Sequence, residues 1–215
     1  LSRFALCCVP RVALASRAGE RRLRQAIDPL VAEVVAKQRA QIGRGRAVAE
    51  ACAPNGRVPT VTSGGIGLAR IGATVRDVGQ SCTTRDTTFS LGEGIQEQGA
   101  VIEFAGHRVL ALVENGTISR LIVADSAFRT ERGLGVGSTV AQLREGYGRL
   151  CGAVGEGTVA VWLSGLPNVS FGLDTRLSDL GSASTRVSDD PSVIPDTARV
   201  TSLWVITEGV ACGGS

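Results

Sequence analysis

Two short stretches of this chain, 65 residues apart, carry the same pattern of residues. Residues 72–75 read Gly-Ala-Thr-Val and residues 137–140 read Gly-Ser-Thr-Val. In each copy the threonine is followed three residues later by Asp77 or Gln142, an arrangement that resembles the capping box at the start of many helices. An internal repeat constrains the fold strongly, because both copies are expected to build the same structural unit.

Strand-like segments follow each of the two expected helices. Asn115-Gly116 separates two of them and predicts a hairpin, because a type I′ turn needs positive φ at both central positions. The last segments of the two copies, TISRLIVA at 117–124 and RVTSLWVI at 199–206, also match. We therefore expect an α+β fold of two tandem repeats, each a short helix followed by an antiparallel three-stranded meander, with the helices on one face of the sheet. The expected strands are residues 100–104, 109–113 and 117–124 in the first repeat, and 158–163, 169–173 and 199–206 in the second.

The charge distribution divides the chain into a basic lead segment and a mildly acidic body. Residues 1–60 hold 11 Lys and Arg against 4 Asp and Glu, whereas residues 61–215 hold 12 against 16. A nucleic-acid partner is not expected, since such binders carry a basic patch on the folded domain. We expect residues 64–212 to form the two-repeat domain, as 64–130 and 131–212. Residues 1–63 are expected to be a basic leader, an amphipathic helix and a linker.

The lead segment allows several interpretations. Residues 1–18 combine an early arginine, an apolar run and small residues, as an export signal does, or they are an unstructured leader. Asp28 and Pro29 suit the start of a helix over residues 28–42, whose apolar residues recur at three- and four-residue spacing. That helix either contacts a membrane surface peripherally or packs on the domain.

The six cysteines favour structural disulfides. None forms a Cys-x-x-Cys motif, and their spacing matches no zinc site. Cys82 and Cys151 each follow an expected helix, and Cys212 follows the last expected strand, so these three are our candidates for cross-links. Six cysteines leave the pairing open. Disulfides persist in oxidising compartments, so we expect an extracytoplasmic protein, located in the periplasm or cell envelope or secreted.

Trp162 and Trp204 are the two tryptophans of the chain, and both fall on expected strands of the second repeat. If the outer face of that sheet is uncovered, they are natural anchors for a protein partner. If they face the helix, they belong to the core.

No group of residues points to catalysis, to a cofactor or to a metal. The glycines of residues 133–139 resemble a phosphate-binding loop, but they lack its lysine and its spacing. His107, the one histidine, stands without a nucleophile motif. The carboxylates of Asp189, Asp190 and Asp196 do not have calcium-loop spacing. The alternative function is a small-ligand receptor or enzyme, with a site between the repeats formed by His107 and the polar loop 174–198.

The block GLGVGSTVAQLREGYG at 133–148, preceded by ISRLIVADSAFRTERG at 118–133, resembles bacterial cell-envelope proteins. Its helix start is similar to the Gly-x-Thr repeat of the SmpA/OmlA outer-membrane lipoproteins. The β-lactamase-inhibitor-protein fold, with two helix-plus-sheet repeats, is also similar. These families bind or assemble proteins without catalytic residues. The resemblance therefore implies a non-catalytic module that acts through protein–protein contact, either in binding or in envelope assembly.

Overall fold

The structure, a computed structural model, describes residues 36–38, 40, 52–90, 96–155, 158–187 and 190–207. The chain divides into two compact units, residues 1–45 and 46–215. Of the first unit, residues 36–38 and 40 are described and are helical. The rest of the helix expected at 28–42, and the export signal expected at 1–18, lie outside the described residues. Everything that follows concerns the second unit.

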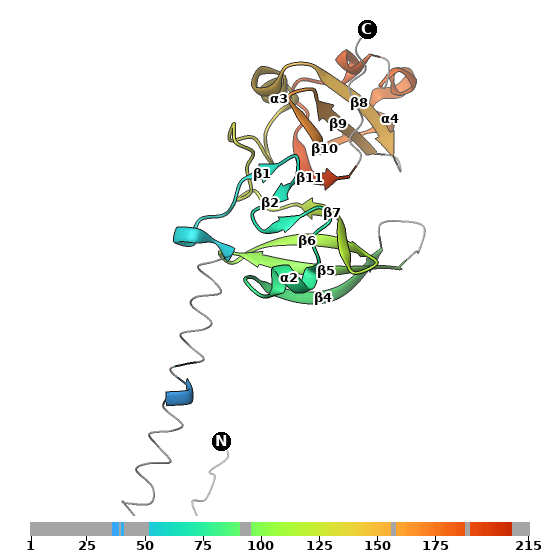
Figure 1. Cartoon of the computed structure of the whole chain (residues 1–215). Helices are drawn as coiled ribbons and strands as arrows, with labels where there is room; N and C mark the ends of the chain where they lie inside the picture. Colours follow the sequence, from blue (N-terminus) through green and yellow to red (C-terminus); the bar gives the residue numbers. More distant parts are fainter. Residues whose placement is uncertain are drawn as a thin grey trace, which may run out of the picture. The chain divides into compact units, whose positions relative to one another are not determined.

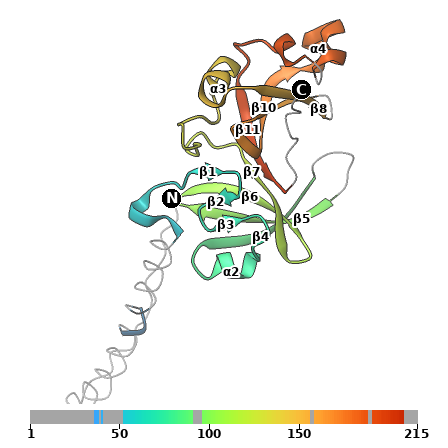
Figure 2. The same cartoon turned by 45° about the horizontal axis from the view of Figure 1, so that its top comes forward.

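The second unit consists mainly of β-strands, which Figures 1 and 2 show from two directions. Three short strands, β1 (Val61–Thr62), β2 (Gly65–Ile66) and β3 (Ala69–Arg70), form a small sheet. The large sheet has eight antiparallel strands in the order β4-β5-β6-β7-β11-β10-β9-β8. Its strands are β4 (Thr83–Ser90), β5 (Gln96–Phe104), β6 (His107–Glu114), β7 (Thr117–Val123), β8 (Leu150–Gly155), β9 (Thr158–Leu163), β10 (Leu166–Arg176) and β11 (Val200–Ile206). The helical segments are short: η1 (Pro54–Gly56), α2 (Val75–Gly79), α3 (Val140–Tyr147), α4 (Leu177–Leu180), η2 (Gly181–Arg186) and η3 (Pro191–Val193).

The expected fold of two helix-plus-three-strand repeats is wrong. The structure has one continuous eight-stranded sheet, a second small sheet and few short helices. All six expected segments are strands, but β4 and β8 were not expected, and they are the two edge strands. β7 and β11 pair with each other at the centre, so the strands form one sheet rather than two separate meanders.

The two edge strands, β4 and β8, were not predicted because neither sequence alternates between apolar and polar residues. β4 reads TTRDTTFS, and seven of its eight residues are polar or charged. β8 reads LCGAVG, in which two glycines interrupt a short apolar run. Strand-like sequence patterns come from burying one face. β4 is instead held by its register with β5, from Thr83 opposite Glu103 to Ser90 opposite Gln96.

The repeated Gly-small-Thr-Val segments start α2 and α3. Thr74 accepts a hydrogen bond from the backbone N–H of Asp77, and Thr139 forms a complete capping box with Gln142. The glycines before them have φ of +84° and +89°, which favours glycine over other residues. The same positions also bind the last strand of each half: Gly72 N–H donates to Ile118 and Gly137 N–H donates to Val200, both at 2.8 Å. The repeated motif therefore joins each helix start to β7 or to β11.

The hydrophobic core lies on one face of the large sheet. There Val109 and Ala111 of β6, Leu121 of β7 and Leu203 of β11 are fully buried, and Leu143 of α3 belongs to the same cluster. We call this the buried face.

The core also draws in segments that were expected to lie outside it. Cys52 and Val61, within the expected linker, are buried in the core. The expected surface loop 174–198 instead contains the end of β10, α4, η2 and η3. Val187 and Ile194 are 0% and 1% exposed and anchor this segment to the core. Burial of these apolar side chains explains why it is structured.

Candidate functional site

A row of paired residues crosses the other face of the large sheet and contains both tryptophans. Residues directly opposite each other on neighbouring strands point to the same side of a sheet. Trp204 pairs with Ile122 on β7 and with Ser170 on β10, and Ser170 pairs with Trp162 on β9. We call this the open face. From β4 to β8 its central row is Arg85, Val101, Leu110, Ile122, Trp204, Ser170, Trp162 and Cys151.

The two tryptophans lie on the face that is not packed against the core. Leu203 and Val205, on either side of Trp204 along β11, are 0% exposed, whereas Trp204 is partly exposed. Trp162 has the same relation to its buried neighbours on β9. The tryptophans are two strands apart, about 10 Å in the hydrogen-bonding direction, and Ser170 between them is 6% exposed. Of the two alternatives that the sequence left open, the structure places both tryptophans on the outer face.

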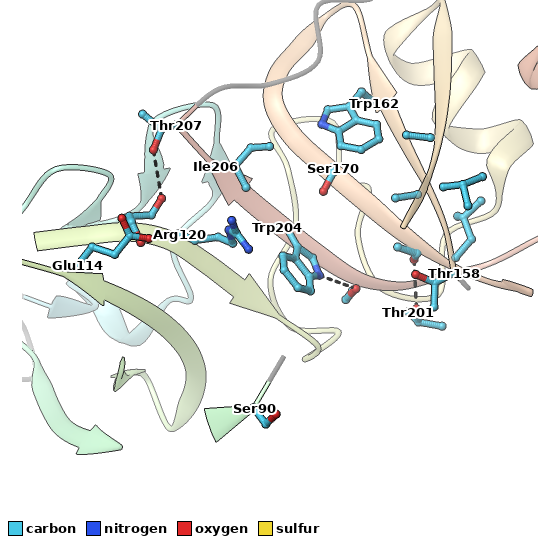
Figure 3. A pocket seen from close by; sticks show the side chains of 17 residues that line it. Ser90, Glu114, Arg120, Thr158, Trp162, Ser170, Thr201, Trp204, Ile206 and Thr207 are labelled. Carbon is cyan, nitrogen blue, oxygen red and sulfur yellow. Dashed lines mark hydrogen bonds between the residues drawn. The ribbon is translucent and has the colours of Figure 1, made fainter. Parts of the chain in front are cut away.

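The open face is hollowed around the tryptophans. A concave region of about 820 Å³ is lined by residues of β4 and of every strand from β6 to β11 (Figure 3). We call this region the hollow. Its apolar surface includes the two indoles, Leu173 and Ile206, and most of the remaining side chains carry hydroxyl groups. Among the described residues that line it, the charged ones are Glu114 and Arg120.

Trp204 is held in place from two sides. Its Nε1–H donates to Ser202 Oγ at 3.1 Å. The guanidinium carbon of Arg120 lies 5.6 Å from the centroid of its ring, a cation–π contact that Figure 3 shows from the side. Gly172 lies opposite Ser202 and has no side chain, which leaves room for the Ser202 hydroxyl. A Cβ at position 172 would lie 2.5 Å from Ser202 Oγ.

A β-bulge brings Arg120 into the hollow together with its neighbour. The register between β6 and β7 shifts, so that Leu112 pairs with Arg120 but Val113 pairs with Ile118. Ser119 is the extra residue, and both Ser119 and Arg120 therefore line the hollow. Ser119 Oγ is buried and has no hydrogen-bond partner in the described part of the chain.

The predicted disulfide cysteines have different outcomes. Cys82 forms a disulfide with Cys52, with an S–S distance of 2.01 Å. Cys151 is also disulfide-bonded, and since Cys52 and Cys82 pair with each other, its partner is outside the described residues. Cys212 itself lies outside them. This disulfide links the first described residue of the second unit to the residue directly before β4.

His107 has a carboxylate partner, Asp125. Its Nδ1 lies 2.8 Å from Asp125 Oδ2. The pKa of Asp125 is lowered, first by the hydrogen bond from the backbone N–H of Ala127 and then by His107. In the described residues no serine, threonine or cysteine side chain is hydrogen-bonded to His107. The hollow is not lined by His107 or by any described residue of 177–198, so it does not join the two parts of the alternative site.

The glycine loop at 133–139 uses its backbone N–H groups within the protein. Gly133 N–H donates to Thr130 O, Gly135 N–H donates to Ser138 Oγ and Gly137 N–H donates to Val200 O. A phosphate-binding loop needs such groups free for its ligand. The N–H groups of Gly133, Gly135 and Gly137 are therefore not available to bind a phosphate.

Two of the three carboxylates that the sequence offered for calcium, those of Asp190 and Asp196, have structural partners. Asp190 accepts from Ser192 N–H at the start of η3, and Asp196 pairs with Arg144 at 3.1 Å. Asp189 lies outside the described residues. Across the described ranges, no group of three or more His, Cys, Asp or Glu side chains is placed to hold a metal ion. Within those same ranges, no helix has the length and apolar character needed to span a membrane.

Comparisons with known proteins find a distant likeness among solved structures. No protein-family model and no curated protein matches the chain. A solved structure, the crystal structure of the uncharacterized protein yfeY from Escherichia coli, is 16% identical, with a TM-score of 0.48. The match covers 68% of this chain and 99% of that chain. A likeness this distant carries no argument about function.

Proposed function

We propose that this chain is a non-catalytic binding module, active outside the cytoplasm, that captures a protein partner on the open face. One observation carries the proposal: Trp162 and Trp204 share one row of a sheet face, are both partly exposed there, and line its hollow. Tryptophan is enriched among the residues that dominate the energy of protein interfaces. A solvent-facing apolar concavity on a folded unit is typical of an interaction site.

The location outside the cytoplasm is supported by the Cys52–Cys82 disulfide, since reducing compartments keep such thiols free. The resemblance of residues 133–148 to envelope proteins favours a role in envelope assembly. The location and the envelope role indicate where the partner would be found. The open face indicates how the partner would be bound.

Site-specific photo-crosslinking in the source organism tests this function. A benzophenone side chain is placed at Thr201, an exposed residue of the hollow. The control position is Leu68, a 43% exposed residue outside the hollow. We expect a discrete protein adduct from Thr201 and none from Leu68. The adduct should disappear in the Trp162→Ala and Trp204→Ala variants, with far-UV circular dichroism unchanged.

Two outcomes would overturn the proposal. An adduct that forms equally well from Leu68, or that survives loss of both tryptophans, would place the contact elsewhere. Absence of any adduct from Thr201 would contradict protein capture on this face.

A further inference from the structure

Arg120 differs in its partners from Arg144 and Arg199. Arg144 pairs with Asp196 and donates to Pro191 O, and Arg199 donates to Gly137 O. The guanidinium of Arg120, by contrast, makes no hydrogen bond or ion pair with any described residue, and it lies over the ring of Trp204. Arg120 therefore keeps its donors available.

Arg120 lines the hollow, so its N–H donors are available to a ligand bound there. Arg120 lies between Leu112 of β6 and Ile206 of β11, so apolar residues flank it on both sides. The cation–π contact with the indole occupies the face of the guanidinium, whereas its N–H groups form no hydrogen bond with a described residue. Glu114, the other charged residue lining the hollow, forms no ion pair with it within 4.0 Å.

We propose that Arg120 recognises an acidic side chain of the partner, which is a polypeptide segment that places apolar side chains against Trp204 and Trp162. This inference rests on the proposed function and names the chemistry of its partner. A guanidinium binds a carboxylate through two parallel hydrogen bonds, and these are stronger when the surroundings are partly desolvated. Trp204 supplies that desolvation on one side of Arg120.

The composition of the hollow favours a polypeptide over other anions. One arginine provides one cation, whereas a nucleic acid or an anionic membrane surface requires several. The hollow, about 820 Å³, is much larger than a single small anion, and apart from Arg120 and Glu114 its lining is hydroxyl-bearing or apolar. Such a surface fits a segment with one carboxylate among apolar and neutral polar side chains.

Selection of displayed random peptides against the purified full chain tests the inference. Peptides are selected with the wild-type protein, and their affinities are then measured with Trp204→Ala, Arg120→Gln and Arg120→Lys. We expect the selected peptides to share an Asp or Glu next to apolar residues. Arg120→Gln should weaken them about tenfold, and replacing that acidic residue by its amide should weaken binding to wild type equally. The amide peptide should then bind wild type and Arg120→Gln alike. Arg120→Lys should recover part of the loss, because lysine keeps the charge but not the planar pair of donors.

The outcomes separate this inference from the proposed function. Peptides that depend on Trp204 but share no acidic residue, and that bind Arg120→Gln as well as wild type, would overturn the acidic partner and leave the open-face site standing. Selected peptides that are insensitive to Trp204→Ala, or a failure to select any, would overturn both. Circular dichroism of each variant shows that the sheet is intact.

Discussion

The two faces of the large sheet are built from the same strands and have opposite roles. Along β11, Leu203 and Val205 are 0% exposed, while Trp204 and Ile206 between and after them are partly exposed and line the hollow. Successive side chains of a strand point to opposite faces. One face therefore provides the core, and the other offers large apolar side chains to the surroundings. Hydrophobic residues on both sides of a strand therefore do not by themselves mean that both sides are buried.

The largest expected effect distinguishes the faces directly. Phe171, 0% exposed on the buried face, pairs with Leu203. Phe171→Ala should lower the free energy of unfolding by about 4 kcal/mol, because it leaves a cavity in the core. Trp204→Ala on the open face should cost about 1 kcal/mol, because its ring is already partly in water. Urea denaturation of the two variants checks this. Equal losses would show that the open face is a second core rather than an interaction surface.

A smaller effect sharpens the comparison on the open face alone. In Gly172→Ala the new methyl group would displace Ser202 Oγ, so Trp204 would lose its hydrogen bond. We expect a loss of about 1 kcal/mol in unfolding free energy, together with a shift of tryptophan fluorescence. Trp162→Phe leaves Trp204 as the single reporter. An unchanged emission spectrum in Gly172→Ala on that background would mean that Ser202 does not position the indole.

The smallest effect concerns the rim of the buried face, where His107 and Asp125 meet beside Phe128. A carboxyl whose pKa is lowered by folding contributes stability above its ordinary pKa, 3.8, and loses it as pH falls through the folded value. Asp125→Asn removes this contribution, which we expect to be within about 1 kcal/mol because both side chains are more than a third exposed. Wild type should therefore exceed the variant in stability near neutral pH, and the gap should narrow in acid below the ordinary pKa. Thermal unfolding at a series of pH values measures it. A gap of constant size would exclude Asp125 as its source.

Much of the local structure was predictable from the sequence. The helix starts at Thr74 and Thr139 follow from capping chemistry that acts within four residues. Asn115 and Gly116 adopt positive φ, +51° and +80°, as the hairpin signal requires. The six segments with apolar or β-branched patterns are strands. These features depend on near neighbours in the chain, so a short window of sequence contains the physical cause.

The candidate site was predictable only in part. The sequence singled out Trp162 and Trp204 but could not say which face they occupy. It gave no signal for Arg120, because one arginine in a strand is unremarkable until Trp204 lies beside it, 84 positions along the chain. The bulge at Ser119 could have been suspected from two successive polar residues within an otherwise apolar strand.

The starts of α2 and α3, the hairpin turn at Asn115 and six of the eight strands could be located in the sequence. That β4 and β8 are strands, that β7 pairs with β11, and that no described element buries the two tryptophans follow from the way distant segments pack. The difference comes from the distance along the chain between the groups that interact. Caps and turns are satisfied by groups a few residues away, whereas an edge strand is held by the hydrogen bonds of a neighbouring strand. The character of a sheet face, in turn, depends on what the rest of the chain lays against it.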